Sequence, residues 1–100
     1  MITGKQRSYL RGLANKIDPI VYIGKQNLTD NIINEINTAL ETRELVKVKI
    51  QENSTLKAKD VANEVASKLG AEYVQAIGRK FTLYRQAEDP EKRQIQLPKK

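Results

Sequence analysis

Two short apolar runs late in the chain, separated by a break with one glycine, constrain the fold most. The runs are residues 73–77 and 81–84, and both contain the β-branched and aromatic residues that favour strands. Gly78 between them can adopt the positive φ angle that a tight reversal requires. The segment is therefore predicted to form a β-hairpin with a three-residue break, in which Arg79 and Lys80 follow Gly78 at the tip.

Two adjacent cations on a rigid turn suit a phosphate or another anion as ligand. The same composition is also typical of an ordinary exposed turn, because glycine and polar residues are common wherever a chain reverses. The hairpin alone leaves both interpretations of Arg79 and Lys80 open.

The charge of the chain is unevenly distributed. Eighteen Lys and Arg residues against twelve Asp and Glu residues give a net charge of +6. Residues 1–25 and residues 79–100 carry +4 each, whereas residues 26–78 carry −2. A surface that serves only solubility would not divide in this way. The distribution favours a basic surface formed by the two ends of the chain, and a polyanion is its natural partner.

Cysteine and histidine are both absent from the sequence. Without cysteine the chain has no disulfide and no thiolate metal ligand, which fits a reducing compartment. Without histidine no side chain titrates near neutrality by default, and no imidazole can activate a nucleophile. The phosphate-binding pattern GxxxxGK(S/T) and the dinucleotide-binding pattern GxGxxG are absent as well. We therefore expect no enzymatic activity, no cofactor, no metal and no small-molecule substrate.

The length and hydropathy of the chain fit one soluble domain. One hundred residues with 39% hydrophobic content can bury a single core. No apolar stretch of about eighteen residues is present, and the first residues lack the apolar core of a signal peptide. We expect a cytoplasmic protein with no membrane association, in which residues 1–98 form the domain and residues 99–100 are a basic C-terminal end.

The spacing of apolar residues predicts three helices, each beginning at a residue that can cap it. The predicted helices are residues 3–15 with Thr3 as cap, residues 29–42 with Thr29, and residues 54–69 with Ser54 or Thr55. Gly70 is expected to end the third helix. The carboxylates Glu35, Glu41 and Glu44 have no metal-ligand companions, and we expect them to be solvated on exposed helix positions.

Two further strands precede the hairpin. Residues 19–23 are a continuous apolar run, which is typical of a buried strand. Residues 45–50 alternate instead, so Lys47 and Lys49 are expected on an open face that suits either solubility or binding. The order of elements is αβαβαββ, with helical crossovers between distant strands. We predict a single two-layer α/β domain: a four-stranded mixed sheet with the second and third helices on one face and the first helix at an edge or end.

Other cations and the tyrosines are candidates for contacts with a polyanion. Lys5, Arg7 and Arg11 lie on the first predicted helix, which contains no acidic residue, and Lys25 follows the first predicted strand. A tyrosine ring can stack on an unpaired base, although a tyrosine buried in a core is the commoner case. The four tyrosines are Tyr9, Tyr22, Tyr73 and Tyr84.

Five segments resemble the CRM domain, named for chloroplast RNA splicing and ribosome maturation, in their order and spacing. They are TGKQRSYLRGLA at residues 3–14, PIVYIGK at 19–25, LT at 28–29, ELVKVK at 44–49, and IGRK followed by LYR within 77–85. The resemblance covers roughly residues 2–98, which is nearly the whole chain.

This resemblance implies a stand-alone, YhbY-like bacterial RNA-binding protein of the cytoplasm, associated with precursors of the large ribosomal subunit. It implies a fold similar to the C-terminal domain of bacterial translation initiation factor three. It also implies that the GxxG-like loop of the family, which is compared with that of KH domains, corresponds to residues 78–81. The fourth position here is Phe81 instead of a second glycine, which leaves a cationic turn beside an aromatic residue.

Together these patterns predict a monomeric, non-catalytic protein that binds structured RNA, above all ribosomal RNA during large-subunit assembly. The expected contact residues are Gly78, Arg79, Lys80, Lys5, Arg7, Arg11, Lys25, Arg85 and Lys47. We expect one continuous positive surface to join the first helix, Lys25 and the hairpin. One alternative is an adaptor whose basic surface meets an acidic protein. Duplex DNA binding is less favoured, because no helix-turn-helix pair is present.

Overall fold

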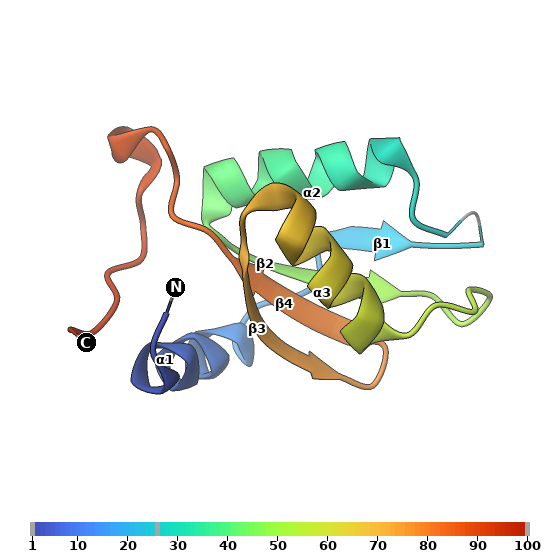
Figure 1. Ribbon diagram of the computed structural model, residues 1–100, viewed down its shortest axis with the longest axis horizontal. Coiled ribbons are helices and arrows are strands. Elements are labelled where there is room, and N and C mark those ends of the chain that lie inside the picture. The colour runs from blue at the N-terminus through green and yellow to red at the C-terminus, as the bar shows by residue number, and fades with distance from the viewer. Residues whose placement is uncertain (1, 26, 100) are drawn as a thin grey trace.

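A four-stranded mixed sheet forms the centre of the structure, a computed structural model that describes residues 2–25 and 27–99 (Figure 1). The elements in chain order are α1 (Gly4–Ala14), β1 (Val21–Ile23), α2 (Asp30–Arg43), β2 (Leu45–Ile50), α3 (Ala58–Leu69), β3 (Glu72–Ile77), β4 (Lys80–Tyr84) and the 3-10 helix η1 (Pro90–Lys92). The predicted order αβαβαββ is confirmed.

The strand order across the sheet is β1-β2-β4-β3. β1 and β2 are parallel, and α2 forms the crossover between them. β4 is antiparallel to both of its neighbours, β2 and β3. The predicted mixed α/β sheet is therefore confirmed.

The main core lies between one face of the sheet and the two helices that cover it, α2 and α3 (Figure 1). Its largest fully buried side chains are Val21, Ile23, Ile36, Leu40, Val46, Val48, Ile50, Val65, Phe81 and Leu83. Burying one such side chain stabilises the fold by about 1.5–3 kcal/mol. The alternation predicted for residues 45–50 is thus confirmed on its apolar side.

α1 packs on the opposite face of the sheet, and only at one end of it. A second, smaller core forms there from Leu10, Ala14, Leu45, Val74 and Tyr84. Ile95 and Leu97 pack against this core, and they belong to the C-terminal segment, which is residues 85–99 after β4. The sheet is therefore covered on both faces at this end. At the other end α1 leaves one face open, because the helix does not extend that far.

Side chains cap the first two helices as predicted. Thr3 Oγ1 accepts a hydrogen bond from Gln6 N at 3.1 Å, and Gln6 Oε1 accepts one from Thr3 N at 3.0 Å. This reciprocal pair is a capping box. Thr29 Oγ1 accepts a hydrogen bond from Ile32 N at 3.2 Å at the start of α2.

The third helix begins later than predicted, at Ala58. Ser54 does not cap it: its hydroxyl donates to Asn27 Oδ1 at 3.0 Å and accepts from Leu56 N at 3.2 Å. Those bonds hold the loop before α3 against the loop after β1. Gly70 ends α3 with a φ of +63°, as predicted.

β1 is a half-exposed edge strand, so the prediction of a buried strand was wrong. Val21 and Ile23 are buried in the main core, but Tyr22 is 49% exposed and Ile20, just before the strand, is 37% exposed. The physical reason is the short reach of α1, which does not cover this part of the sheet.

Glu44 is fully buried at 0% exposure, which corrects the prediction that its carboxylate is solvated. Its Oε1 accepts hydrogen bonds from Gln94 N at 2.6 Å and from Ile95 N at 2.9 Å. Its Oε2 accepts one from Ala87 N at 2.8 Å. The carboxylate therefore anchors the C-terminal segment against the end of α2.

Glu41 anchors the same segment one helical turn earlier. Its two carboxylate oxygens accept hydrogen bonds from Glu88 N at 2.9 Å and Asp89 N at 3.1 Å. These bonds lower the pKa of Glu41 below its ordinary value. The prediction of a freely solvated carboxylate was wrong here too, whereas Glu35 is exposed as predicted.

No helix in the described part of the chain combines the length and the apolar character needed to cross a bilayer. Within residues 2–25 and 27–99, no three His, Cys, Asp or Glu side chains are grouped so as to hold a metal ion.

Candidate nucleic-acid interface

The hairpin turn contains two residues instead of the predicted three. Lys80 already belongs to β4, where it pairs with Ile77 of β3, and Gly78 and Arg79 form the turn. Gly78 has a φ of +59°, as predicted. A positive φ at the first central position is typical of a type II′ turn. The placement of Lys80 at the tip was therefore wrong, and its side chain belongs to a face of the sheet.

Arg79 lies at the turn, beside the end of β2. Its Nη1 donates a hydrogen bond to Gln51 O at 3.3 Å, and its carbonyl oxygen accepts one from Ile50 N at 2.7 Å. These bonds fix the turn to β2. The residue is nevertheless exposed, and a guanidinium has five N–H donors, so it can bind a phosphate at the same time.

The sheet face that α1 leaves open presents one complete row of side chains across all four strands. From β1 to β3 the strand register gives this row as Tyr22, Lys49, Lys80 and Ile77. Neighbouring strands are about 5 Å apart, so adjacent members of the row are close. We call these four residues the open row. Its two outer members are 49% and 64% exposed, respectively.

A second row lies between the open row and α1, and we call it the inner row. It consists of Lys47, Thr82 and Gln75. Gln75 Nε2 donates to Asn15 Oδ1, at the end of α1, at 3.4 Å. A groove of about 270 Å³ is lined by the whole inner row, by Lys80 and Ile77 of the open row, and by Asn15 and Arg79. The hairpin and α1 therefore lie on the same side of the sheet.

The two lysines in the middle of the open row are direct cross-strand neighbours. Like charges in this position destabilise a sheet. Between side chains of residues 2–25 and 27–99, the only ion pair within 4 Å joins Lys68 to Glu64 on α3. Neither Lys49 nor Lys80 has a carboxylate partner there. The fold gains nothing from this pair of charges, and a bound polyanion would neutralise it.

Arg7 and Arg11 lie along the edge strand β3. Arg7 Nε donates to Tyr73 O at 3.1 Å, and Arg11 Nε donates to Val74 O at 3.4 Å. Both bonds fall where the register of β3 shifts at a bulge, so these side chains secure α1 to the sheet. Their role in RNA contact stays a prediction.

Lys5 and Lys25 are both exposed but belong to distant parts of the molecule. Figure 1 shows the start of α1 and the loop between β1 and α2 at opposite ends of the long axis, which measures 40 Å. One continuous surface that joins all of these cations stays a prediction, and it would have its centre at the two rows and the turn. Lys5 and Lys25 lie at its margins.

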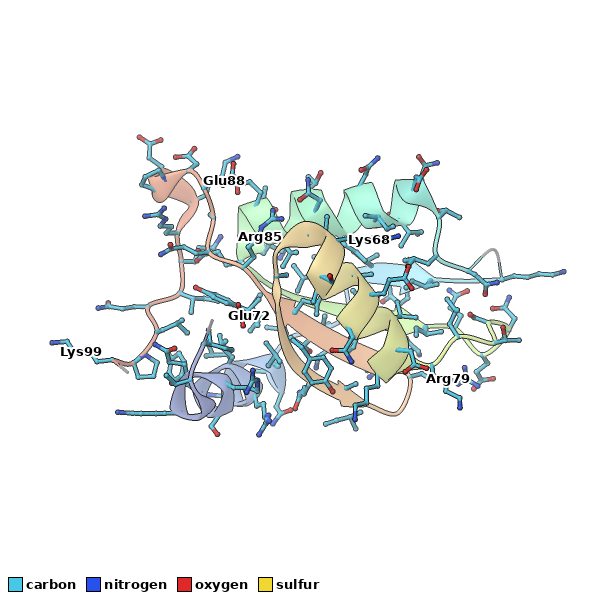
Figure 2. All side chains as sticks on the ribbon, in the orientation of Figure 1. Lys68, Glu72, Arg79, Arg85, Glu88 and Lys99 are labelled. Carbon is cyan, nitrogen blue, oxygen red and sulfur yellow. The ribbon has the colours of Figure 1, made fainter. Side chains whose placement is uncertain are left out.

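Arg85 is engaged in the fold on the helix-covered side of the sheet. Its Nη1 donates to Asn37 Oδ1 at 2.8 Å and to Leu69 O at 2.9 Å, and its Nη2 donates to Asn37 O at 3.2 Å. Figure 2 shows Arg85 between α2 and α3, far from Arg79 at the hairpin. We therefore leave Arg85 out of the candidate interface and assign it to the joining of two helices.

Phe81 does not lie beside the cationic turn as a stacking surface. Its side chain is 1% exposed and belongs to the main core. Strand alternation is the physical reason, because Phe81 and Leu83 must both face α2 and α3. The correspondence with a GxxG loop ends at Lys80.

The hairpin has a second groove on its other side, which sequence reasoning missed. This groove measures about 680 Å³ and is lined by residues 54–59, Ala76, Gly78 and Arg79. It includes Lys57 and Lys59 at the start of α3, and Arg79 lines both grooves. The late start of α3 brings these lysines to the hairpin, and the predicted helix start at residue 54 concealed this.

An apolar cleft of about 630 Å³ lies between α1, the start of β2 and the C-terminal segment. Its apolar lining includes Tyr9, Leu13 and Ile95, and Lys16 is among the cations that border it. Lys47 lines both this cleft and the groove at the inner row. The groove and the cleft are therefore neighbours that meet at Lys47.

Comparisons with known proteins agree with this architecture. Residues 2–85 match the family model of the CRS1 / YhbY (CRM) domain. The "Probable RNA-binding protein YqeI" of Bacillus subtilis is 41% identical over 98 residues, which is 98% of this chain and 100% of that protein. An "RNA-binding protein" of Haemophilus influenzae is 35% identical over 99 residues, which is 99% of this chain and 97% of that protein. The solution structure of the hypothetical protein SAV1595 from Staphylococcus aureus matches with a TM-score of 0.71 at 41% identity, covering 98% of this chain and 100% of that one.

Proposed function

The chain belongs to the CRS1 / YhbY (CRM) domain family, and we propose that it is a non-catalytic protein that binds RNA through the open and inner rows and the hairpin turn. The names of its relatives in Bacillus subtilis and Haemophilus influenzae support RNA as the partner. One observation carries the proposal: Lys49 and Lys80 are cross-strand neighbours with no carboxylate partner among the described residues.

Phosphates of an RNA strand fit this arrangement of donors. Lys49 and Lys80 provide adjacent point charges on the sheet, and Lys47 extends them towards α1. Arg79 can bind a phosphate through two parallel N–H donors. Gly78 contributes by permitting the turn that positions Arg79. Release of counterions from the RNA would supply much of the affinity and make it depend on salt.

We propose further that the RNA is ribosomal RNA in precursors of the large ribosomal subunit, and that the protein acts as a cytoplasmic monomer. The chain's membership of the CRS1 / YhbY (CRM) domain family supports this assignment, because the resemblance to the CRM domain implies a role in precursors of the large ribosomal subunit. A fragment of large-subunit ribosomal RNA is therefore the RNA of choice for binding experiments. It should bind more tightly than an unrelated RNA of the same length and degree of folding.

Replacing Arg79 and Lys80 together by Ala is expected to weaken binding to this fragment and to flatten its salt dependence. Each lost phosphate contact lowers the slope of log affinity against log salt by about 0.7–0.9, so the pair lowers it by up to about 1.4–1.8. Affinity measured at several salt concentrations gives the slope. Both side chains are exposed, so the melting temperature should change little.

The matched control replaces Lys68 and Lys92 by Ala, which removes the same charge from exposed positions on α3 and η1. Figure 2 shows Lys68 on the helix-covered side of the sheet. This variant should keep nearly the original affinity. Equal losses in both variants would mean that only net charge matters. An unchanged slope in the Arg79/Lys80 variant would remove the hairpin from the interface, and no affinity for any RNA would favour the adaptor.

A further inference from the structure

Tyr22 is an aromatic side chain that the two cores do not use. Tyr73 packs against the main core and Tyr84 lies in the second core, whereas Tyr22 is 49% exposed on an edge strand. Its neighbours Val21 and Ile23 face the main core, so its ring points to the open side of the sheet. The Tyr22 hydroxyl donates to Pro19 O at 3.3 Å, which restricts the ring to one region of this surface.

The register places this ring beside cations. Tyr22 pairs with Lys49, and Lys49 pairs with Lys80 on the next strand. One strand spacing of about 5 Å separates each pair, a distance that a flexible lysine side chain easily spans. An aromatic surface and two phosphate-binding groups therefore lie within the dimensions of one or two nucleotides. Ile77, 64% exposed, provides an apolar surface at the far end of the row.

We propose that the open row binds an unpaired segment of RNA, with a base stacked on Tyr22 and the adjoining phosphates on Lys49 and Lys80. This inference rests on the proposed RNA-binding function and adds the class of RNA. A duplex keeps its bases stacked on one another and has no base face to offer. A single-stranded loop or end can place a splayed base on an aromatic ring of a sheet.

Tyr22→Leu tests the stacking contact, because leucine keeps an apolar side chain on the strand but has no ring. Affinity for a single-stranded RNA is expected to fall about 5- to 160-fold, the range typical of one lost base–aromatic stack. The salt dependence should stay unchanged, since no charge is removed. Affinity for a duplex RNA of equal length should not change. Tyr22→Phe, which removes only the hydroxyl, should retain the original affinity.

Tyr9→Leu is the matched control, because Tyr9 is the other strongly exposed tyrosine, at 44%, and lies on α1 outside the row. It should bind single-stranded RNA with unchanged affinity. The chain contains no tryptophan, so Tyr22→Trp introduces a single fluorescent reporter. Single-stranded RNA should quench this fluorescence by stacking, and duplex RNA should leave it unchanged. This readout remains informative if the leucine variant folds poorly, because an aromatic residue preserves the strand.

Four results would overturn the inference. Wild-type affinity of the Tyr22→Leu variant for single-stranded RNA, with no quenching in the tryptophan variant, would exclude stacking and leave the proposed RNA binding intact. Equal losses for single-stranded and duplex RNA, or equal losses in the Tyr9→Leu control, would assign the effect to something other than an unpaired base. If the unaltered chain binds neither form, the proposed function itself fails.

Discussion

Replacing Glu44 by Gln is expected to lower the free energy of unfolding by about 2–4 kcal/mol, although the two side chains have nearly the same size. The Glu44 carboxylate is 0% exposed and accepts the N–H groups of Ala87, Gln94 and Ile95. The amide of glutamine has only one oxygen, so at least one of these buried N–H groups would face another donor. The C-terminal segment would lose one of its two carboxylate anchors, and the second core, against which Ile95 and Leu97 pack, would loosen.

Urea unfolding measures this change, and two variants separate its causes. Glu35→Gln alters an exposed glutamate of α2, the helix that ends just before Glu44, so its effect should stay within about 0.5 kcal/mol. Glu44 also has a φ of +65°, which glycine adopts without strain. Glu44→Gly therefore relieves backbone strain while removing the acceptor, and it should still be destabilised. A Glu44→Gln variant as stable as the original chain would show that the carboxylate does not hold the segment.

The stabilisation by Glu44 should depend on pH. Burial raises the pKa of Glu44. The N–H groups of Ala87, Gln94 and Ile95 and the charge of Arg93 together lower this pKa by more than burial raises it, so the net pKa lies below the ordinary 4.5. A group whose pKa is depressed by folding stabilises above its unfolded-state pKa, and this contribution is lost as the pH falls through the folded value. The difference between Glu44→Gln and the original chain should therefore be full at neutral pH and shrink as the pH falls below about 4.5.

Changing Lys49 to Glu is expected to raise stability while it lowers RNA affinity. The substitution turns the like-charge pair with Lys80 into an opposite-charge pair, which adds about 0.2–1 kcal/mol to the free energy of unfolding. It also replaces a phosphate-binding cation by an anion. Affinity for RNA should fall roughly 10- to 20-fold at physiological salt, from one lost phosphate contact and the added repulsion. Thermal melts and binding curves of the same preparations measure both effects.

The double variant, in which Lys49 and Lys80 are both replaced by Glu, completes the test. It restores a like-charge pair, so its stability should return close to that of the original chain, while its RNA affinity falls further. Such opposite effects are expected where a pair of charges serves a ligand and not the fold. Parallel losses of stability and affinity in Lys49→Glu would instead identify Lys49 as a structural residue.

Local patterns were enough to predict the elements whose determinants lie close together in the chain. The caps at Thr3 and Thr29 bond to N–H groups three residues away, and the positive φ of Gly78 depends on the turn alone. The alternation of residues 45–50 fixes which side of β2 is apolar. These features need no knowledge of the tertiary structure, which is why they were found.

Features that depend on distant partners could not be predicted in the same way. Glu44 bonds to backbone N–H groups more than forty residues away, and backbone groups leave no mark in a sequence. Tyr22 looked like a core residue because a continuous apolar run does not reveal how far α1 extends over the sheet. Likewise, Lys80 joins Lys49 only through the register of β2 and β4. The basic residues could be identified from sequence, but not their arrangement.

Chemical-shift mapping of the ¹⁵N-labelled chain during titration with single-stranded ribosomal RNA tests the location of the interface most directly. The largest changes are expected in the two rows and the turn, including Tyr22, Lys47, Lys49, Arg79 and Lys80. Exposed amides on the outer surfaces of α2 and α3 should change little. If the largest chemical-shift changes occurred on those helices and the open side of the sheet were unaffected, the proposed location of the RNA interface would be contradicted.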